Sequence, residues 1–166
     1  MRIHILIAVA CASICPAAQA DSPLPPPKRH AVLSPDGRTQ AISDPKAGTS
    51  VVRLQDKKLL WRVPGFYWWL FVANDGKHLV TAYIGMNLIP TDSRDDLVLF
   101  TFWREGQRIE EITLKEFIPQ RTILRRTISH LYWGSIEGID ARGRLKVERA
   151  DKRIFYFDVT SGKDTR

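Results

Sequence analysis

The sequence has little cysteine and no long apolar segment beyond its start. Only two cysteines, Cys11 and Cys15, occur among 166 residues, and both lie in the first 20. A mature chain without this segment has no cysteine, which excludes stabilising disulfides. No later stretch approaches the roughly 20 apolar residues of a transmembrane helix. We therefore expect stability to come from core packing, and no transmembrane segment in the mature chain.

The first 20 residues have the pattern of a secretory signal peptide. Arg2 precedes an apolar run over Ile5 to Ile14, and Ala18-Gln19-Ala20 forms a small-residue cleavage pattern before Asp21. Cleavage near Ala20 predicts a periplasmic or secreted protein. It removes one arginine and no acid, so the net charge of +7 becomes +6. This basic excess favours an exported protein partner with an acidic surface, or a cell-wall polymer, before nucleic acid.

The sequence also lacks the motifs of common catalytic and metal sites. His30, His78 and His130 are scattered, and none has a partner at the spacing of a zinc site. Ser135, within Gly134-Ser135-Ile136-Glu137-Gly138, does not fit the G-x-S-x-G spacing of a nucleophile elbow. We therefore predict no catalytic residues, no bound metal, no cofactor and no enzymatic activity.

What the chain has instead are short apolar runs separated by turn residues. Residues 21–29 contain four prolines, which predicts an extended leader before a domain over residues 30–166. In the central stretch, Gly65 to Lys77, both alternating faces of residues 68–73 are apolar, which indicates a strand covered on both sides. Asn74-Asp75-Gly76 then provides a tight turn. The pattern predicts an all-β fold in a single domain.

The turns divide the domain into about three antiparallel units of four strands each. The expected strands are 31–33, 39–43, 50–54 and 59–63; then 66–73, 78–84, 97–103 and 108–114; then 122–128 or 131–136, 139–140, 145–148 and 153–159. Gly76 follows Gly37 by 39 residues, within the range of propeller blades, while Gly143 follows Gly76 by 67. The longer interval contains a connector over residues 115–130, with one helical turn near 115–118 and a basic face.

Two families resemble this arrangement. The turns Ser34-Pro35-Asp36-Gly37-Arg38 and Ala73-Asn74-Asp75-Gly76-Lys77 resemble those in blades of WD40-like and TolB-like β-propellers. This resemblance implies a propeller-like meander that binds through its loops and faces. A fainter resemblance is to small exported immunity proteins that protect Gram-negative bacteria from type VI cell-wall amidase effectors. It implies that a loop, here Gly85 to Asp96, plugs the cleft of a toxin.

Candidate binding residues lie in that loop, in the basic connector and in an aromatic pair. Together they are Asn87, Asp92, Arg94, Asp95, Arg121, Arg125, Arg126, Tyr132 and Trp133. The arginines could grip an acidic partner through charge-assisted hydrogen bonds, or form a solvated basic edge. Asp92, Asp95 and Asp96 could supply oxygen ligands to calcium, but a solvated charged loop is the favoured interpretation.

The leading hypothesis is therefore an exported, non-enzymatic protein-binding module, and its sharpest form is an inhibitor or immunity protein. The alternative is a cell-envelope carbohydrate or peptidoglycan binder that uses exposed aromatic side chains in Phe66-Tyr67-Trp68-Trp69 and Tyr132-Trp133. Core packing is the favoured role for most of these aromatic residues. Because neighbouring strand residues face opposite ways, Trp68 and Trp69 are not expected to face the same ligand.

Overall fold

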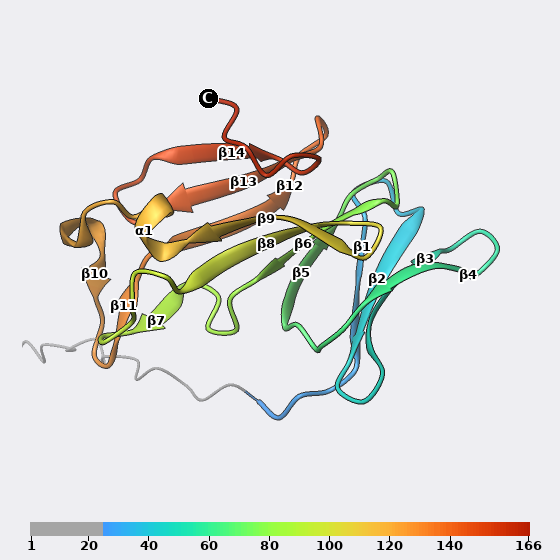
Figure 1. Ribbon diagram of the computed structural model, residues 1–166, viewed down its shortest axis with the longest axis horizontal. Helices are drawn as coiled ribbons and strands as arrows, with labels where there is room; N and C mark the ends of the chain where they lie inside the picture. Colours follow the sequence, from blue (N-terminus) through green and yellow to red (C-terminus); the bar gives the residue numbers. More distant parts are fainter. Residues whose placement is uncertain (1–24) are drawn as a thin grey trace, which may run out of the picture.

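The computed structural model describes residues 25–166, and the predicted signal peptide lies outside this range (Figure 1). Residues 25–29, the described part of the proline-rich leader, have no regular secondary structure. The strands are β1 (His30–Leu33), β2 (Thr39–Asp44), β3 (Gly48–Arg53), β4 (Lys58–Val63), β5 (Trp69–Val72), β6 (His78–Ala82), β7 (Leu88–Pro90), β8 (Val98–Arg104), β9 (Gln107–Thr113), β10 (Arg125–Arg126), β11 (His130–Tyr132), β12 (Gly134–Ile139), β13 (Arg144–Arg149) and β14 (Ile154–Asp158). The helical turns are α1 (Leu114–Phe117) and the 3₁₀ turn η1 (Arg121–Ile123).

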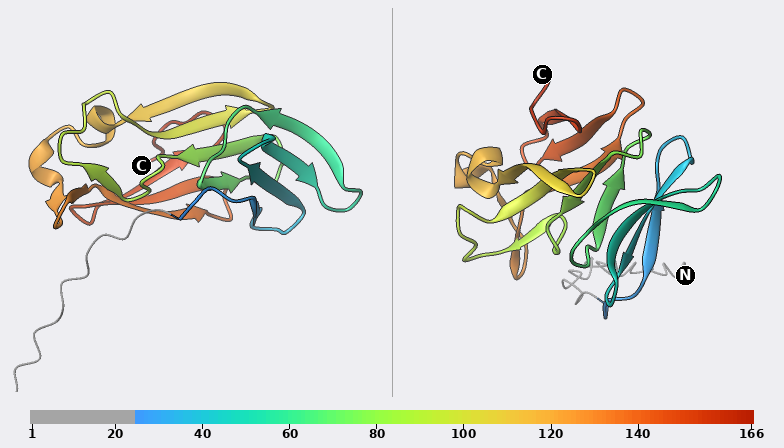
Figure 2. Two further views of the ribbon diagram at one scale, coloured as in Figure 1. Left: turned by 90° about the horizontal axis from the view of Figure 1, so that it is seen from below. Right: turned by 45° about the vertical axis from the view of Figure 1, so that its right-hand side comes forward.

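The strands form four antiparallel sheets, which confirms the all-β prediction. The first sheet has the order β1-β2-β3-β4, the middle sheet β5-β6-β8-β9 and the third sheet β12-β13-β14. A small sheet has the order β10-β11-β7. Figures 1 and 2 show the middle sheet between the first and the third. The initial strands of the outer sheets, β1 and β12, both contact β5.

Equivalent turns connect the first and second strands of all three larger sheets. Gly37, Gly76 and Gly143 occupy these turns with φ of 70°, 65° and 74°, a left-handed conformation that favours glycine. Their surroundings differ. A Cβ on Gly76 would lie 2.9 Å from Leu60 of the first sheet, whereas a Cβ on Gly143 has no atom within 4 Å. Of these two turns, only the one at Gly76 is wedged against a neighbouring sheet.

The middle sheet is covered on both faces, as the apolar stretch predicted. Every residue of β6 is buried. Leu79 joins a cluster with Ala41 and Val51 of the first sheet. Val80 joins the larger cluster that includes Leu145 of the third sheet. The core therefore has two layers, one on each side of the middle sheet, and burial of this apolar surface stabilises the stack of sheets.

The third unit differs from its prediction. Its sheet has three strands, and the expected strand over 122–128 or 131–136 is divided between two sheets. Arg125–Arg126 and His130–Tyr132 pair in the small sheet, where Leu131 lies opposite the fully buried Ile89 of β7. Burial of Ile89 requires a partner strand, and β11 provides it. The chain crosses to the third sheet at Trp133.

Within residues 25–166, no helix combines the length and the apolar character required to cross a membrane.

Candidate functional site

The small sheet brings together the two predicted binding segments. Residues 83–97 leave the middle sheet after β6 and return to it at β8, and their strand β7 pairs with β11. β11 pairs in turn with β10 of the connector. The predicted site residues of residues 87–95 and of residues 121–132 therefore lie at one end of the molecule. We call residues 83–97 and 121–132 together the loop-connector face.

Two indole groups hold the beginning of this loop. Trp69 Nε1 donates to the Ile84 carbonyl oxygen at 2.9 Å, and Trp133 Nε1 donates to the Met86 carbonyl oxygen at 2.6 Å. Met86 itself has a φ of 53°. Gly85 is required because a Cβ there would lie 2.3 Å from the Leu88 carbonyl oxygen. The loop therefore has a fixed conformation, because backbone carbonyls that would otherwise lack a partner are bonded from the core side.

The structure places Trp133, one of the predicted partner-binding residues, in the core and not on the surface. Its side chain is fully buried and lies against Phe100 and Phe117, with ring centroids 5.5 Å and 5.8 Å away. Its backbone N–H donates to the Asn87 carbonyl oxygen at 3.1 Å, and its carbonyl oxygen accepts from Ala150 at 2.9 Å. Trp133 lies where the chain crosses between the small sheet and the third sheet. Its side chain packs in the core and bonds the loop backbone at Met86 from the core side.

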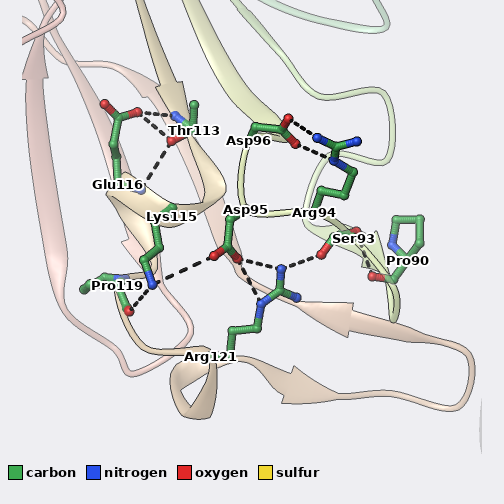
Figure 3. A network of polar contacts seen from close by, with 10 residues as sticks. All are labelled: Pro90, Ser93, Arg94, Asp95, Asp96, Thr113, Lys115, Glu116, Pro119 and Arg121. Carbon is green, nitrogen blue, oxygen red and sulfur yellow. Dashed lines mark hydrogen bonds and ion pairs between the residues drawn. The ribbon is translucent and has the colours of Figure 1, made fainter.

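The loop and the connector are also joined by charged groups (Figure 3). Arg121 donates to Asp95 Oδ1 through Nε at 3.1 Å and Nη2 at 2.8 Å, and it also donates to the Ser93 carbonyl oxygen. These hydrogen bonds lower the pKa of the Asp95 carboxyl below its ordinary value. Lys115 Nζ lies 3.9 Å from the same carboxylate. Asp95 and Arg121 thus bind each other, and this pair joins the loop to the connector.

A second pair lies beside the first. Arg94 donates to both carboxylate oxygens of Asp96, at 3.1 Å and 2.8 Å. The helical turn α1 begins at a capping box in which Thr113 and Glu116 bond each other's backbone N–H groups. The hydrogen bonds from Thr113 lower the pKa of the Glu116 carboxyl. These contacts fix the connector where it leaves the middle sheet.

Charged and apolar groups remain accessible on the same face. Arg125 and Arg126 are exposed in β10, and within residues 25–166 neither is in an ion pair. Asp92 is exposed, whereas Asn87 and Tyr132 are half-buried. Ile84 and Ile128 are 53% and 62% exposed, and sequence reasoning missed them. The sequence did contain a signal of this exposure, because each is a single aliphatic residue next to loop residues.

The side chains of the aromatic run over residues 66–69, which follows the first sheet, lie in different surroundings, as strand alternation predicts. Trp69 packs against the larger core cluster, while Leu70 belongs to the smaller cluster on the other face. Trp68 instead lies beside Phe66, 5.1 Å away between ring centroids, and both are half-buried. Trp68 and Trp69 therefore have different surroundings, as expected, and residues 66–68 remain accessible.

The remaining titratable groups do not assemble into a metal site. Across residues 25–166, no group of three or more His, Asp or Glu side chains could hold a metal ion. His78 Nδ1 lies 2.6 Å from Asp75 Oδ2, within the central turn. Ser135 is half-buried in β12, where it pairs with Glu148. Asp95 and Asp96, which could have bound calcium together with Asp92, each bind an arginine.

A comparison with protein-family models gives no match, and a comparison with curated proteins gives none. The case for a function therefore depends on the geometry of the loop-connector face.

Proposed function

We propose that this protein is an exported, non-enzymatic protein-binding module whose loop-connector face contacts a partner with an acidic surface. The observation that carries the proposal is the pairing of β7 with β11, which brings two segments about 40 residues apart into one supported face. Arg125 and Arg126 are exposed in β10, and in the part of the chain that the structure describes neither forms an ion pair. Such guanidinium groups are suited to bidentate contacts with carboxylates.

The rigidity of the face supports this proposal. Binding is tighter when a loop does not lose freedom on association. Here the two indole-carbonyl hydrogen bonds and the Asp95–Arg121 pair fix the loop within the unbound protein. The exposed Ile84 and Ile128 supply apolar contact beside the charged residues. Arginine is enriched at protein interfaces, where its guanidinium can form several contacts.

Two finer parts of the proposal rest on the sequence. The signal-peptide pattern of residues 1–20 supports export to the periplasm or beyond. The faint resemblance to immunity proteins supports an inhibitory role, in which residues 85–96 obstruct the cleft of an exported enzyme. In that role the partner's activity falls in proportion to the bound protein.

Affinity capture with matched charge reversals tests the proposal. The mature chain is immobilised and exposed to a periplasmic extract, and the captured protein is quantified. We expect one stoichiometric partner, lost with the double variant Arg125→Glu and Arg126→Glu. The matched control reverses Arg104 and Arg142, two exposed arginines that also lack an ion pair within residues 25–166 and lie away from this face.

The control should retain the partner, and added salt should weaken capture because the contacts are between exposed charges. Absence of any stoichiometric partner would contradict the proposal. So would a partner that both double variants bind equally well, because the loop-connector face would then play no part. For the inhibitory role, purified partner is assayed with and without the protein; undiminished activity in the complex excludes inhibition.

A further inference from the structure

A cleft between the link from β4 to β5 and the middle sheet forms a site separate from the arginines of β10. It has a volume of about 290 Å³ and lies where the link from β4 to β5 passes the ends of β6 and β8. Aromatic residues Phe66, Tyr67, Trp68 and Tyr83 line it together with Thr81 and Thr101. The lining has no Asp, Glu, Lys, Arg or His side chain. This volume is at the lower end of small-molecule sites, which suits one ring-sized group.

The aromatic wall of the cleft is held in place before any ligand arrives. Phe66 meets Trp68 edge to face, with ring centroids 5.1 Å apart and an interplanar angle of 81°. His30 stacks on Trp68 at 5.8 Å and 19°, and meets Phe66 edge to face at 5.5 Å. Three rings from two parts of the chain therefore support each other. A supported wall can accept a flat group without reorganisation.

Hydroxyl groups complete the lining. The Thr81 hydroxyl accepts from Trp103 Nε1 at 3.0 Å, which leaves its own hydrogen to donate. Thr101 is 9% exposed and lines the cleft, where its hydroxyl can bond a polar group of a ligand. Burial raises the pKa of the Tyr67 phenol, with a smaller contribution from Glu111, so this group stays a neutral donor. Hydroxyls at the cleft wall can exchange a water partner for a polar group of a ligand.

We propose that this cleft binds one pyranose ring of a neutral saccharide. A pyranose has C–H groups on its faces, which suit the rings of Phe66 and Trp68, and hydroxyls around its rim, which can bond Thr81 and Thr101. The lack of charged side chains in the lining disfavours an ionic ligand, whose desolvation would be uncompensated. None of these residues is an arginine of β10, although Tyr83 and Ile84 of the lining belong to the loop-connector face.

Titration of the mature protein with maltotriose, cellotriose and the trimer of N-acetylglucosamine tests the proposal by NMR. We expect one of these sugars to shift the amide signals of Thr81 and Thr101 and the indole signal of Trp68, with a Kd on the order of 1 mM for a site that holds a single ring. Thr101→Val keeps the shape of the side chain and should weaken binding by about tenfold, the effect of one neutral hydrogen bond. Trp68→Ala should abolish it.

Two control variants lie outside the cleft. Thr160→Val removes an exposed hydroxyl, and Tyr156→Ala removes a half-buried ring on the third sheet; both should bind as the unmodified protein does. Thermal melting confirms that each variant is folded. The proposal is overturned if no sugar produces a saturable shift, or if Thr101→Val and Trp68→Ala bind unchanged.

One further outcome assigns the cleft to a protein ligand. If the sugars do not bind, while Trp68→Ala and Thr101→Val weaken capture of the protein partner, the cleft receives a partner side chain and the saccharide proposal fails. Conversely, sugar binding that survives Arg125→Glu and Arg126→Glu supports the saccharide site even when no protein partner is captured. The two proposals can therefore fail separately.

Discussion

Replacement of Trp133 by alanine tests whether the binding loop depends on support from the core. The side chain is fully buried, contacts Phe100 and Phe117, and bonds the Met86 carbonyl oxygen at 2.6 Å. Removal of a buried tryptophan costs about 3–5 kcal/mol of unfolding free energy. Trp133→Phe retains most of the apolar contact but leaves the Met86 carbonyl without its donor, which costs about 1–3 kcal/mol.

Urea denaturation followed by circular dichroism measures both losses. The free energy of unfolding of a small domain is about 5–15 kcal/mol in total. The loss in Trp133→Ala should therefore lower the melting temperature by on the order of 10 °C. Hydrogen exchange separates local from global effects. In Trp133→Phe, the amides of Met86 and Leu88, which donate within the loop, should exchange faster while those of β3 change little. A loss below about 1 kcal/mol in Trp133→Ala would refute the assignment of this residue to the core.

Two other predictions concern a glycine and an ion pair. Gly85→Ala places a Cβ 2.3 Å from the Leu88 carbonyl oxygen and should cost about 1–3 kcal/mol by overpacking; an unchanged urea midpoint would contradict this. Hydrogen bonds from the buried Arg149 lower the pKa of Asp151 from 3.8 to about 2. The carboxylate therefore stabilises the fold above pH 3.8, and this contribution is lost as the pH falls through about 2. The stability difference between the unmodified protein and Asp151→Asn should shrink over that window, and parallel urea midpoints across it would refute the pairing.

The strands of the first two sheets could be predicted because strand alternation and turn residues are visible within short segments of sequence. Each strand is short, and each Asp-Gly turn determines where the chain reverses. The expected strands 39–43 and 59–63 differ by a residue or less at each end from β2 and β4. The third unit was less predictable because β7 and β11, about 40 residues apart, pair through one buried residue, Ile89. The residue pattern within each of these two segments does not reveal that they pair with each other.

The candidate site was predictable by segment but not by side chain. Charge and loop position indicated residues 85–96 and 121–126, but could not show that Arg121 binds Asp95 while Arg125 and Arg126 remain accessible. Alternation predicted that Trp68 and Trp69 have different surroundings, but did not reveal that Trp69 packs against the larger core cluster while Trp68 lines the cleft. Thr101 had a visible signal, a polar residue within the apolar strand from Leu99 to Phe102, and only the fold shows that it lines a cleft.

The three equivalent glycine turns have a consequence for how this chain tolerates change. Turns at equivalent positions in different sheets tolerate substitution differently, and a turn packed between two sheets tolerates it least. The Gly76 turn is such a joint, because Trp61 Nε1 donates to its carbonyl oxygen at 2.7 Å and Leu60 leaves no room for a Cβ. The Gly143 turn has open space around it. Peptide tags or affinity loops can therefore be inserted at Gly143, whereas an insertion at Gly76 would separate the first sheet from the middle one.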